Sequence, residues 1–284
     1  MSLKNTGKEL ANTKFAFIGC GVMAESMITG LLDKELVVGT QISASHPRAE
    51  RRDELQSAYS INVFGGNGNA VSEACSADDA IVLLCVKPQR LNAVLKDIVG
   101  QVTKNAVVIS IVAGATAATI AKVLETEKVV RCMPNTPSQI GHGMAVWTCT
   151  ESVSGEEREK VKTLLSALGR EMYVENEHMI DMATSLSATG PTYTFLVMEA
   201  LTDAGVHLGF SREMSKELVQ ETMLGAVLFA MESDLHPAEL RNMVTSPGGT
   251  SADAIYQMEK GGLRTVLSKA VFSAYQKAVE LGKD

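Results

Sequence analysis

The sequence contains no apolar run that approaches the roughly 20 residues a membrane-spanning helix requires. It also lacks an excess of basic residues, because 33 acidic and 26 basic side chains give a formal net charge of -7. This charge argues against general affinity for nucleic acid or for an anionic membrane. No internal repeat or low-complexity segment is present. We therefore expect a small-molecule ligand as the partner, and neither nucleic acid nor a membrane.

Cysteine and histidine do not occur in the pairs that hold metals or build disulfide frameworks. The five cysteines are scattered without a Cys-x-x-Cys pair, and the five histidines lie far apart. Scattered cysteines in odd number are typical of free thiols in a reducing compartment, whereas zinc sites need closely spaced ligands. We therefore expect a cytoplasmic protein without a metal site.

Residues 14–32 carry the clearest local pattern. Five mostly apolar residues precede a glycine turn, and apolar residues at helical spacing follow it, which predicts a strand, a turn and a helix. Gly19 permits the turn, and Gly21 lets the backbone approach a diphosphate that faces the helix N-terminus. Ala24 is the third small residue, where strand and helix touch. This order is typical of a dinucleotide-binding domain, although a tight turn in another α/β sheet would look similar.

The chain has 284 residues, of which 45% are hydrophobic, and can form two domains. Alternating strands and helices predict an α/β domain over residues 14–175, with a doubly wound sheet of Rossmann type. Long runs rich in Ala, Leu, Met and Glu predict an all-helical domain over residues 176–284, whose apolar surplus indicates a dimer. Residues 1–13 are polar, so we expect a disordered lead-in or tag remnant and neither a signal peptide nor an anchor.

The residues after the second predicted strand, 41–45, indicate which cofactor is bound. NAD-binding domains carry an acidic residue there, which binds the ribose 2′-hydroxyl. Here His46, Arg48, Arg51 and Arg52 follow instead and offer donors for a 2′-phosphate. We therefore expect NADP(H) to be preferred, with NAD(H) as the alternative. The arginines could also form the solvated face of the next predicted helix, 47–57.

Further predicted strands end in turns that could contact the cofactor. The apolar strand 80–86 stops at Lys87-Pro88, at the edge where ligands bind in doubly wound sheets, although a lysine there could simply be solvated. Ala113-Gly114 forms a small-residue turn after strand 106–110. Pro134-Asn-Thr-Pro137 fixes an extended loop, which could lie beside a nicotinamide or be a rigid turn without a ligand. We expect residues 65–69 to form a flexible polar loop.

One stretch, Thr245-Ser-Pro-Gly-Gly-Thr-Ser251, interrupts the helical domain. Its proline and two glycines let backbone N–H groups converge directly before a helix, which suits a small carboxylate. Asp253 in the first turn opposes an anion, so such a site would rely on backbone donors. The alternative is a plain helix N-cap by Thr250 or Ser251.

These motifs together resemble those of the pyrroline-5-carboxylate reductase family, which catalyses the last step of proline synthesis. The resemblance runs from about residue 14 to the C-terminus. It is carried by Phe17-Ile-Gly-Cys-Gly21, Val86-Lys-Pro88, Ala113-Gly114 with Thr116, Arg131-Cys-Met-Pro-Asn-Thr-Pro137, Gly190-Pro-x-Tyr193, His236-Pro237 and Ser246-Pro-Gly-Gly-Thr250. It implies a Rossmann domain, a helical dimerisation domain, and a homodimer that assembles further, up to a decamer. It also implies hydride transfer from NAD(P)H to the imine carbon of 1-pyrroline-5-carboxylate, which gives L-proline.

The resemblance also implies a set of site residues. Those for the cofactor are Gly19, Cys20, Gly21, Val22, Met23, His46, Arg48, Asn69, Val86, Lys87, Pro88 and Ala113. Those for the substrate are Glu177, Ser246, Gly248, Gly249, Thr250 and Ser251, of which Thr250 and Ser251 are the expected catalytic hydroxyls. The sequence departs from the family at Ser251, where Thr is usual, and at Ser187-Ala-Thr-Gly-Pro191, where the family usually has Ser-Gly-Ser or Ser-Gly-Pro.

Two other hypotheses remain open at this point. A 3-hydroxyacid dehydrogenase has a similar two-domain design, but its chemistry normally uses a Lys or His base, and no such residue lies within 246–251. A non-catalytic NADP(H)-sensing protein would keep the glycine turn and Arg48 but would not need the carboxylate corner. Binding of a proline-like carboxylate only with cofactor present would separate the enzyme from the sensor.

Overall fold

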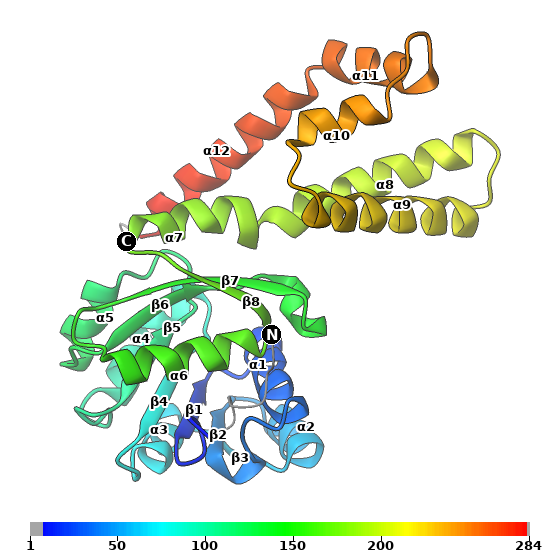
Figure 1. Ribbon diagram of the computed structural model, residues 1–284. Helices are drawn as coiled ribbons and strands as arrows, with labels where there is room; N and C mark the ends of the chain where they lie inside the picture. Colours follow the sequence, from blue (N-terminus) through cyan, green and yellow to red (C-terminus); the bar gives the residue numbers. More distant parts are fainter. Residues whose placement is uncertain (1–7, 283–284) are drawn as a thin grey trace. The chain divides into compact units, whose positions relative to one another are not determined.

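The computed structural model describes residues 8–282, which form two compact units (Figure 1). Unit 1 contains the chain up to Thr189 and again from Ala274 onward, and unit 2 contains Gly190–Ser273. The sequence pattern places the domain boundary after residue 175, but the units change at Thr189 because helix α7 (His178–Ala183) packs against the sheet of unit 1. No helix within residues 8–282 combines the length and apolarity needed to span a bilayer.

Unit 1 is built on an eight-stranded sheet in the order β3-β2-β1-β4-β5-β6-β7-β8. The strands are β1 (Lys14–Ile18), β2 (Ile42–Ser45), β3 (Asn62–Phe64), β4 (Ala80–Leu84), β5 (Val107–Ser110), β6 (Val129–Met133), β7 (Gly143–Cys149) and β8 (Gly169–Tyr173). Neighbouring strands are parallel except β6 and β7, which are antiparallel. The predicted doubly wound sheet of Rossmann type is confirmed, as are its strands with small shifts at their ends.

Helices cover both faces of this sheet (Figure 1). One face carries α1 (Val22–Asp33), α2 (Ala49–Tyr59) and α6 (Gly155–Ser166), and the other carries α3 (Asn67–Ala74), α4 (Pro88–Ile98) and α5 (Ala117–Leu124). Because side chains alternate along a strand, Phe15 and Phe17 of β1 join the first core while Ala16 and Ile18 join the second. Burial on both faces explains why the central strands are apolar almost throughout.

Two differences from the sequence prediction concern the helices α3 and α7. The expected loop 65–69 is wrong, because α3 already begins at Asn67, where Ala70, Val71 and Ala74 bury an apolar face against the sheet. The second is α7, which continues into a π-helical turn, Thr184–Ala188. The apolar pattern of α7 is too short to show a helical period. The helix is stabilised by the packing of Ile180 against the rest of unit 1.

Residues 8–13, the last part of the predicted lead-in, pack onto unit 1. The side chain of Leu10 is 0% exposed and belongs to the first core. The Nε2 group of Gln41 donates to the backbone oxygens of Leu10 and Thr13 at 2.8 and 2.9 Å. This end of the segment is therefore fixed, while residues 1–7 lie outside the described part.

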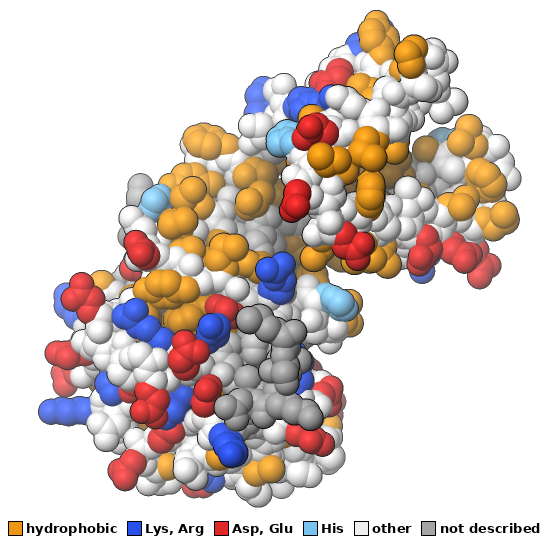
Figure 2. All heavy atoms as spheres, viewed as in Figure 1, with side chains coloured by type: hydrophobic (Ala, Val, Ile, Leu, Met, Phe, Trp, Pro, Cys, Tyr) orange, Lys and Arg blue, Asp and Glu red, His pale blue; other side chains and the backbone are white. Residues whose placement is uncertain are grey.

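Unit 2 consists of helices whose apolar side chains are mostly exposed. Its helices are α8 (Gly190–His207), α9 (Arg212–Glu232), α10 (Pro237–Met243), α11 (Thr250–Lys260) and most of α12 (Leu263–Leu281). No apolar side chain in residues 190–273 is buried, and Phe195 and Phe229 are 61% and 52% exposed. Figure 2 shows hydrophobic side chains at the surface over these helices. The predicted helical domain with surplus apolar surface is thus present.

Candidate functional site

The carboxyl ends of the adjacent parallel strands β2, β1, β4 and β5 meet at one edge of the sheet. In the pairing register Ile18 lies opposite both Ser45 and Leu84, and Leu84 lies opposite Ser110. The four strands therefore end at the same level, and the loops after them start side by side. Most predicted cofactor residues belong to these loops, at the position where doubly wound sheets bind ligands.

The glycine turn after β1 brings the backbone close to the neighbouring loops. Gly19 has a φ of 82°, and a Cβ at this position would lie 2.4 Å from Cγ1 of Val86. A larger residue would therefore be both strained and obstructed. Gly21 is the N-cap residue of α1, and Gly21 and Val22 are exposed. Free N–H groups at the start of α1 can donate hydrogen bonds to a diphosphate, so this turn fits a dinucleotide.

Cys20 contributes backbone and packing to the turn rather than chemistry. Its N–H donates to the backbone oxygen of Ser45 at 2.9 Å, and its side chain is buried. Burial raises the pKa of the Cys20 thiol to about 12. The thiol therefore stays neutral and is a poor nucleophile near pH 7.

A buried serine connects the turn to α3. Ser45 Oγ accepts a hydrogen bond from the N–H of Gly19 at 3.2 Å and donates to Oδ1 of Asn67 at 2.7 Å. Asn67 Nδ2 donates to Oδ2 of Asp97 at 2.9 Å. The predicted residue, Asn69, lies exposed in the first turn of α3. Sequence analysis missed this connection of Asn67 to the glycine turn, and a cofactor contact of Asn69 stays a prediction.

Three arginines follow β2, and they differ in the partners they have. Arg51 forms ion pairs with one carboxylate of α1 and one of α2. Arg52 Nη1 donates to the backbone oxygens of His46 and Pro47 at 3.1 and 2.9 Å. The exposed guanidinium of Arg48 has no hydrogen bond or ion pair within the described residues. Arg48 is therefore the arginine available to a 2′-phosphate.

His46 supports this end of the edge as a neutral group. Its Nδ1 accepts a hydrogen bond from the N–H of Arg48 at 3.3 Å. Burial lowers the pKa of His46, and the charges of Arg48, Arg51 and Arg52 lower it further against the opposing effect of that hydrogen bond. The imidazole is therefore neutral at pH 7 and does not compete with Arg48 as a cation.

The loops after β4 and β5 border a cavity of about 420 Å³. Lys87 is the exposed N-cap residue of α4, and Pro88 begins that helix. Ala113 is half-buried, with Gly114 beside it at a φ of 78°. The cavity is lined by Pro88, Gln89, Leu91, Asn92, Val112, Ala113, Gly114, Ala115, Thr116, Thr119, Leu281 and Gly282. Apolar walls next to polar helix starts would suit one flat ring with an amide.

The side chain of Asn135 fixes the loop 134–137 by hydrogen bonds to two other segments. Asn135 Oδ1 accepts from the N–H of Met144 at 2.8 Å, and its Nδ2 donates to the backbone oxygen of Ser187 at 3.3 Å. Thr136–Ile140 forms a 3₁₀ turn directly after it. Asn135 thereby holds the end of the π-helical turn Thr184–Ala188, which comes directly before α8.

Glu177, the predicted substrate residue of unit 1, lies at the start of α7. Its Oε1 accepts from the N–H of Ala117 at 2.7 Å and from Nη1 of Arg131 at 3.3 Å. Arg131 was not predicted, because its partners are distant in sequence. Contact between Glu177 and a substrate stays a prediction.

The corner 246–251 in unit 2 has the backbone that a small anion would need. Gly248 has a φ of 71°, and the N–H of Gly249 donates to the backbone oxygen of Ser246 at 3.0 Å. Gly249 is the N-cap residue of α11, and no side chain caps that helix. The alternative cap by Thr250 or Ser251 is therefore not observed. Thr250 is exposed and Ser251 half-buried at the helix start, where backbone N–H groups lack intrahelical partners.

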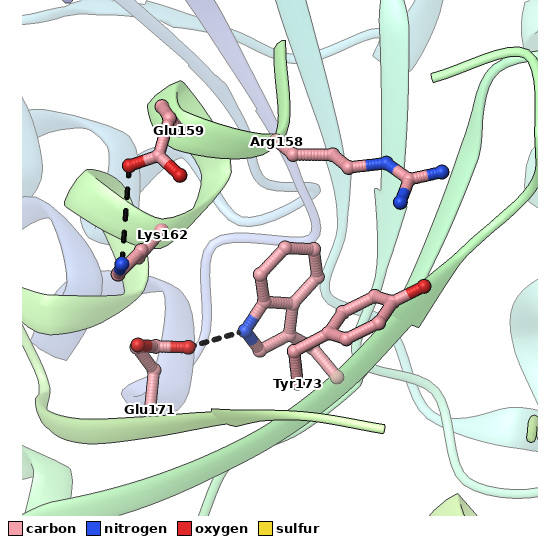
Figure 3. A pocket seen from close by; sticks show the side chains of 6 residues that line it. Arg158, Glu159, Lys162, Glu171 and Tyr173 are labelled. Atoms are coloured by element: carbon pink, nitrogen blue, oxygen red, sulfur yellow. Dashed lines mark hydrogen bonds and ion pairs between the residues drawn. The ribbon is translucent and has the colours of Figure 1, made fainter. Parts of the chain in front are cut away.

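A second cavity of unit 1, of about 270 Å³, lies between α6 and strands β7 and β8 (Figure 3). It is lined by Trp147, Arg158, Glu159, Lys162, Glu171 and Tyr173. Much of its polar surface is already paired: Trp147 Nε1 donates to Glu171 Oε2 at 2.6 Å, and the Arg158 guanidinium lies 5.8 Å from the ring centre of Tyr173. This cavity lies at the β7–β8 edge of the sheet, away from the glycine turn after β1.

Comparison with known proteins places both units in one family. A sequence profile described as pyrroline-5-carboxylate reductase dimerisation matches residues 177–281. A profile described as NADP oxidoreductase, coenzyme F420-dependent, matches residues 14–114. The chain is 38% identical over 275 residues to a pyrroline-5-carboxylate reductase of Pseudomonas aeruginosa, covering 96% of this chain and 98% of the relative.

Solved structures agree with this likeness over nearly the whole chain. A pyrroline-5-carboxylate reductase from Coxiella burnetii is 34% identical with a TM-score of 0.84, covering 96% of this chain and 100% of that one. The pyrroline carboxylate reductase of Plasmodium falciparum, solved with NADP bound, is 28% identical with a TM-score of 0.86, covering 95% and 98%.

Proposed function

The chain belongs to the pyrroline-5-carboxylate reductase family. From this premise we propose which of its residues bind the cofactor and which bind the substrate. It reduces 1-pyrroline-5-carboxylate to L-proline with hydride from a nicotinamide cofactor, which is the last step of proline biosynthesis. The single observation that carries this function is the full-length likeness to reductases of that name. The likeness favours it over the hydroxyacid dehydrogenase and the sensor hypotheses.

NADP(H) is the preferred cofactor in this proposal, and NAD(H) is bound more weakly. The end of β2 lacks the acidic residue that would bind a free 2′-hydroxyl and repel a phosphate. The free guanidinium of Arg48 there suits a phosphate, because charge-assisted hydrogen bonds to phosphate are strong. The NADP bound to the Plasmodium relative is consistent with this preference.

The residues of unit 1 hold the cofactor in this proposal. The turn 19–23 binds the diphosphate through backbone N–H groups at the start of α1. Val86, Lys87, Pro88 and Ala113 border the ribose and the nicotinamide, and the apolar walls beside them exclude water. When bound, the cofactor supplies the hydride.

In this proposal the corner 246–251 of unit 2 supplies most of the substrate contacts. The backbone of Gly248 and Gly249, with Ser246 and Thr250, binds the carboxylate, and the Ser251 hydroxyl orients the ring nitrogen. A protonated cyclic imine accepts hydride without a strong acid, so the chain mainly has to align the reacting carbons. This explains why the corner needs neither a lysine nor a histidine.

Oxidation of NADPH and NADH in the presence of 1-pyrroline-5-carboxylate tests the proposal. We expect turnover with both and a higher kcat/KM with NADPH, with L-proline formed in equal amount to the cofactor oxidised. Absence of turnover with either cofactor would refute the reductase function. A higher kcat/KM with NADH would refute only the cofactor preference. A reaction without substrate serves as the control.

A homodimer formed through unit 2 is the proposed working form, with further assembly up to a decamer. Exposed apolar side chains such as Phe195 and Phe229 would otherwise face water, and the matched profile describes dimerisation. Light scattering on a sizing column would measure the assembly, and Phe229→Asp should weaken it. We also propose a cytoplasmic location, because all five cysteines are free thiols.

A further inference from the structure

A buried arginine on β6 faces α7. The Arg131 side chain is 2% exposed, and Nη2 donates to Oδ1 of Asp181 at 2.5 Å, while Nη1 reaches Glu177. Its Nε is buried and has no hydrogen-bond partner in residues 8–282. Burying a charge is unfavourable, and well-packed apolar residues often stabilise such a position equally well. Stability of the fold alone therefore does not explain this guanidinium.

Through Glu177, Arg131 is connected to the start of α5. The oxygen that accepts from Arg131 also accepts from the N–H of Ala117, the first residue of α5, at 2.7 Å. This N–H has no acceptor within its own helix. Thr116 Oγ1 accepts from the N–H of Thr119 at 3.2 Å, so the first turn of α5 is held by two separate side chains. Loss of the Glu177 contact would leave the N–H of Ala117 without a partner, and Thr116 alone would hold the first turn of α5.

A small apolar cluster connects α7 to the loop before α5 at a second point. Met133, Val146, Val174 and Ile180 are its buried members, and Ala113 packs against them. Ile180 belongs to α7, so a shift of α7 moves the surface on which Ala113 rests. The loop 111–116 is thus supported at Ala113 by the cluster that contains Ile180, and at its end, at Ala117, by Glu177 before α7.

We propose that Arg131 is a positioning residue: it fixes α7 through Glu177 and Asp181, and thereby fixes the loop 111–116 at the nicotinamide end of the cofactor site. The inference rests on the proposed function, because Ala113 is a predicted cofactor contact. The same arrangement occupies Oε1 of Glu177 with two donors. Its Oε2, which has no hydrogen-bond partner in the described chain, is left for the substrate.

Two charge-balanced double variants test the proposal. R131M/D181N removes the guanidinium together with one of its carboxylates. The control, K128M/E157Q, removes an ion pair of the same design at the amino end of β6, where Lys128 Nζ lies 2.6 Å from Glu157 Oε1 and Glu157 Oε2 accepts from the N–H of Ser154 at 2.8 Å. Both pairs hold a helix start, but the control pair lies away from the cofactor edge.

For each protein we would measure the Kd for NADPH by titration of its fluorescence, the KM values and kcat, and the melting temperature. R131M/D181N should raise the Kd and the KM for NADPH about tenfold, the scale of one lost charge-assisted hydrogen bond. Its kcat should change much less. R131K should recover part of the affinity, because a lysine can pair with one carboxylate but not hold both. K128M/E157Q should lower the melting temperature and leave the Kd unchanged.

An unchanged Kd in folded R131M/D181N, or an equal rise in the control, would overturn the proposal. If circular dichroism shows that R131M/D181N does not fold, the Kd of R131K for NADPH tests the proposal. A wild-type Kd in R131K would then overturn the proposal. Failure of the proposed function would look different: the wild-type protein would bind NADPH without oxidising it in the presence of 1-pyrroline-5-carboxylate. The Kd comparison is independent of that result.

Discussion

The N–H of Gly19 donates a hydrogen bond to Oγ of Ser45 at 3.2 Å, which joins the turn after β1 to the end of β2. The same hydroxyl donates to Asn67 and so reaches the first residue of α3. Three segments that would surround the diphosphate and the adenosine are therefore fixed by one buried side chain. These hydrogen bonds come from the chain itself, so the turn is preorganised for a ligand, which lowers the cost of binding.

Ser45→Ala should lower the free energy of unfolding by about 1 to 2 kcal/mol, because the N–H of Gly19 and the amide of Asn67, both half-buried, each lose a partner. It should also weaken NADPH binding, since the glycine turn loses its support. Urea unfolding and NADPH titration measure the two effects. Ser43→Ala is the matched control, because Ser43 is also buried on β2 but lies away from the turn. Equal NADPH affinities in the two variants would contradict the prediction.

The strands and the glycine turn of the candidate cofactor edge could be predicted because their determinants are local. A glycine turn between a strand and a helix is visible in consecutive residues, and parallel strands bring their carboxyl ends together. The hydrogen bonds of Asn67 could not be predicted, because they depend on the residue at which α3 begins. Arg131 was missed for another reason: its carboxylates lie 46 and 50 residues away and meet it only in the folded sheet.

Arg48→Ala should raise the Kd for NADPH about tenfold and leave NADH binding unchanged, since only NADPH carries the 2′-phosphate. Because the Arg48 side chain has no ion pair in the described chain, the melting temperature should stay the same. The ratio of kcat/KM for the two cofactors is the measurement. Arg51→Ala is the control, because it breaks ion pairs with Glu25 and Glu54 and should reduce stability without a selective loss of NADPH. An unchanged cofactor ratio in Arg48→Ala would remove this residue from the phosphate site.

Gly114→Ala tests the contact between the cofactor loop and the end of α12. A Cβ at Gly114 would lie 2.5 Å from the carbonyl carbon of Leu281, and the φ of Gly114 is 78°. Gly100 has a φ of 77°, but a Cβ there would have no neighbour within 4 Å, so Gly100→Ala carries the backbone strain alone. That strain is about 1 to 2 kcal/mol in either variant.

Gly114→Ala should therefore destabilise the protein by about 1 to 3 kcal/mol more than Gly100→Ala, the scale of overpacking. It should also raise the KM for NADPH, because Ala113 precedes the displaced residue. Chemical unfolding and steady-state kinetics of the two variants give the comparison. Equal losses of stability in the two variants would mean that Leu281 at the end of α12 does not contact Gly114 in solution.

Glu157 gives the protein a stability that depends on pH. Burial raises its pKa, but hydrogen bonds from Lys128 and from Ser154 lower it and prevail, so the pKa lies below the ordinary value of 4.5. A carboxyl group whose folded pKa is lowered contributes stability above its unfolded pKa, and this stability is lost as the pH falls through the folded value. Glu157→Gln should thus be less stable than wild type by about 1 kcal/mol at pH 7.

The difference between Glu157→Gln and wild type should shrink below pH 4.5 and disappear in more acidic solution. Thermal unfolding at a series of pH values from neutral downward measures it. Glu159→Gln on the same helix is the control, because that side chain is 62% exposed and its pairing with Lys162 is long, at 3.9 Å. A stability difference for Glu157→Gln that stays constant with pH would show that packing, and not charge, causes it.

Ser251→Ala should reduce kcat/KM about 5- to 150-fold, which corresponds to about 1 to 3 kcal/mol of transition-state stabilisation. The reason is the loss of the hydroxyl that would orient the ring nitrogen. Ser251→Thr restores that hydroxyl with the residue usual in the family, so its activity should stay near wild type. Ser211→Ala is the control in the same unit, because Ser211 Oγ accepts from the N–H of Met214 and only caps α9. Since no side chain caps α11, Ser251→Ala should leave stability nearly unchanged while Ser211→Ala reduces it. Full activity in Ser251→Ala would remove the Ser251 hydroxyl from the substrate site and leave the proposed carboxylate contacts of the corner to the other residues.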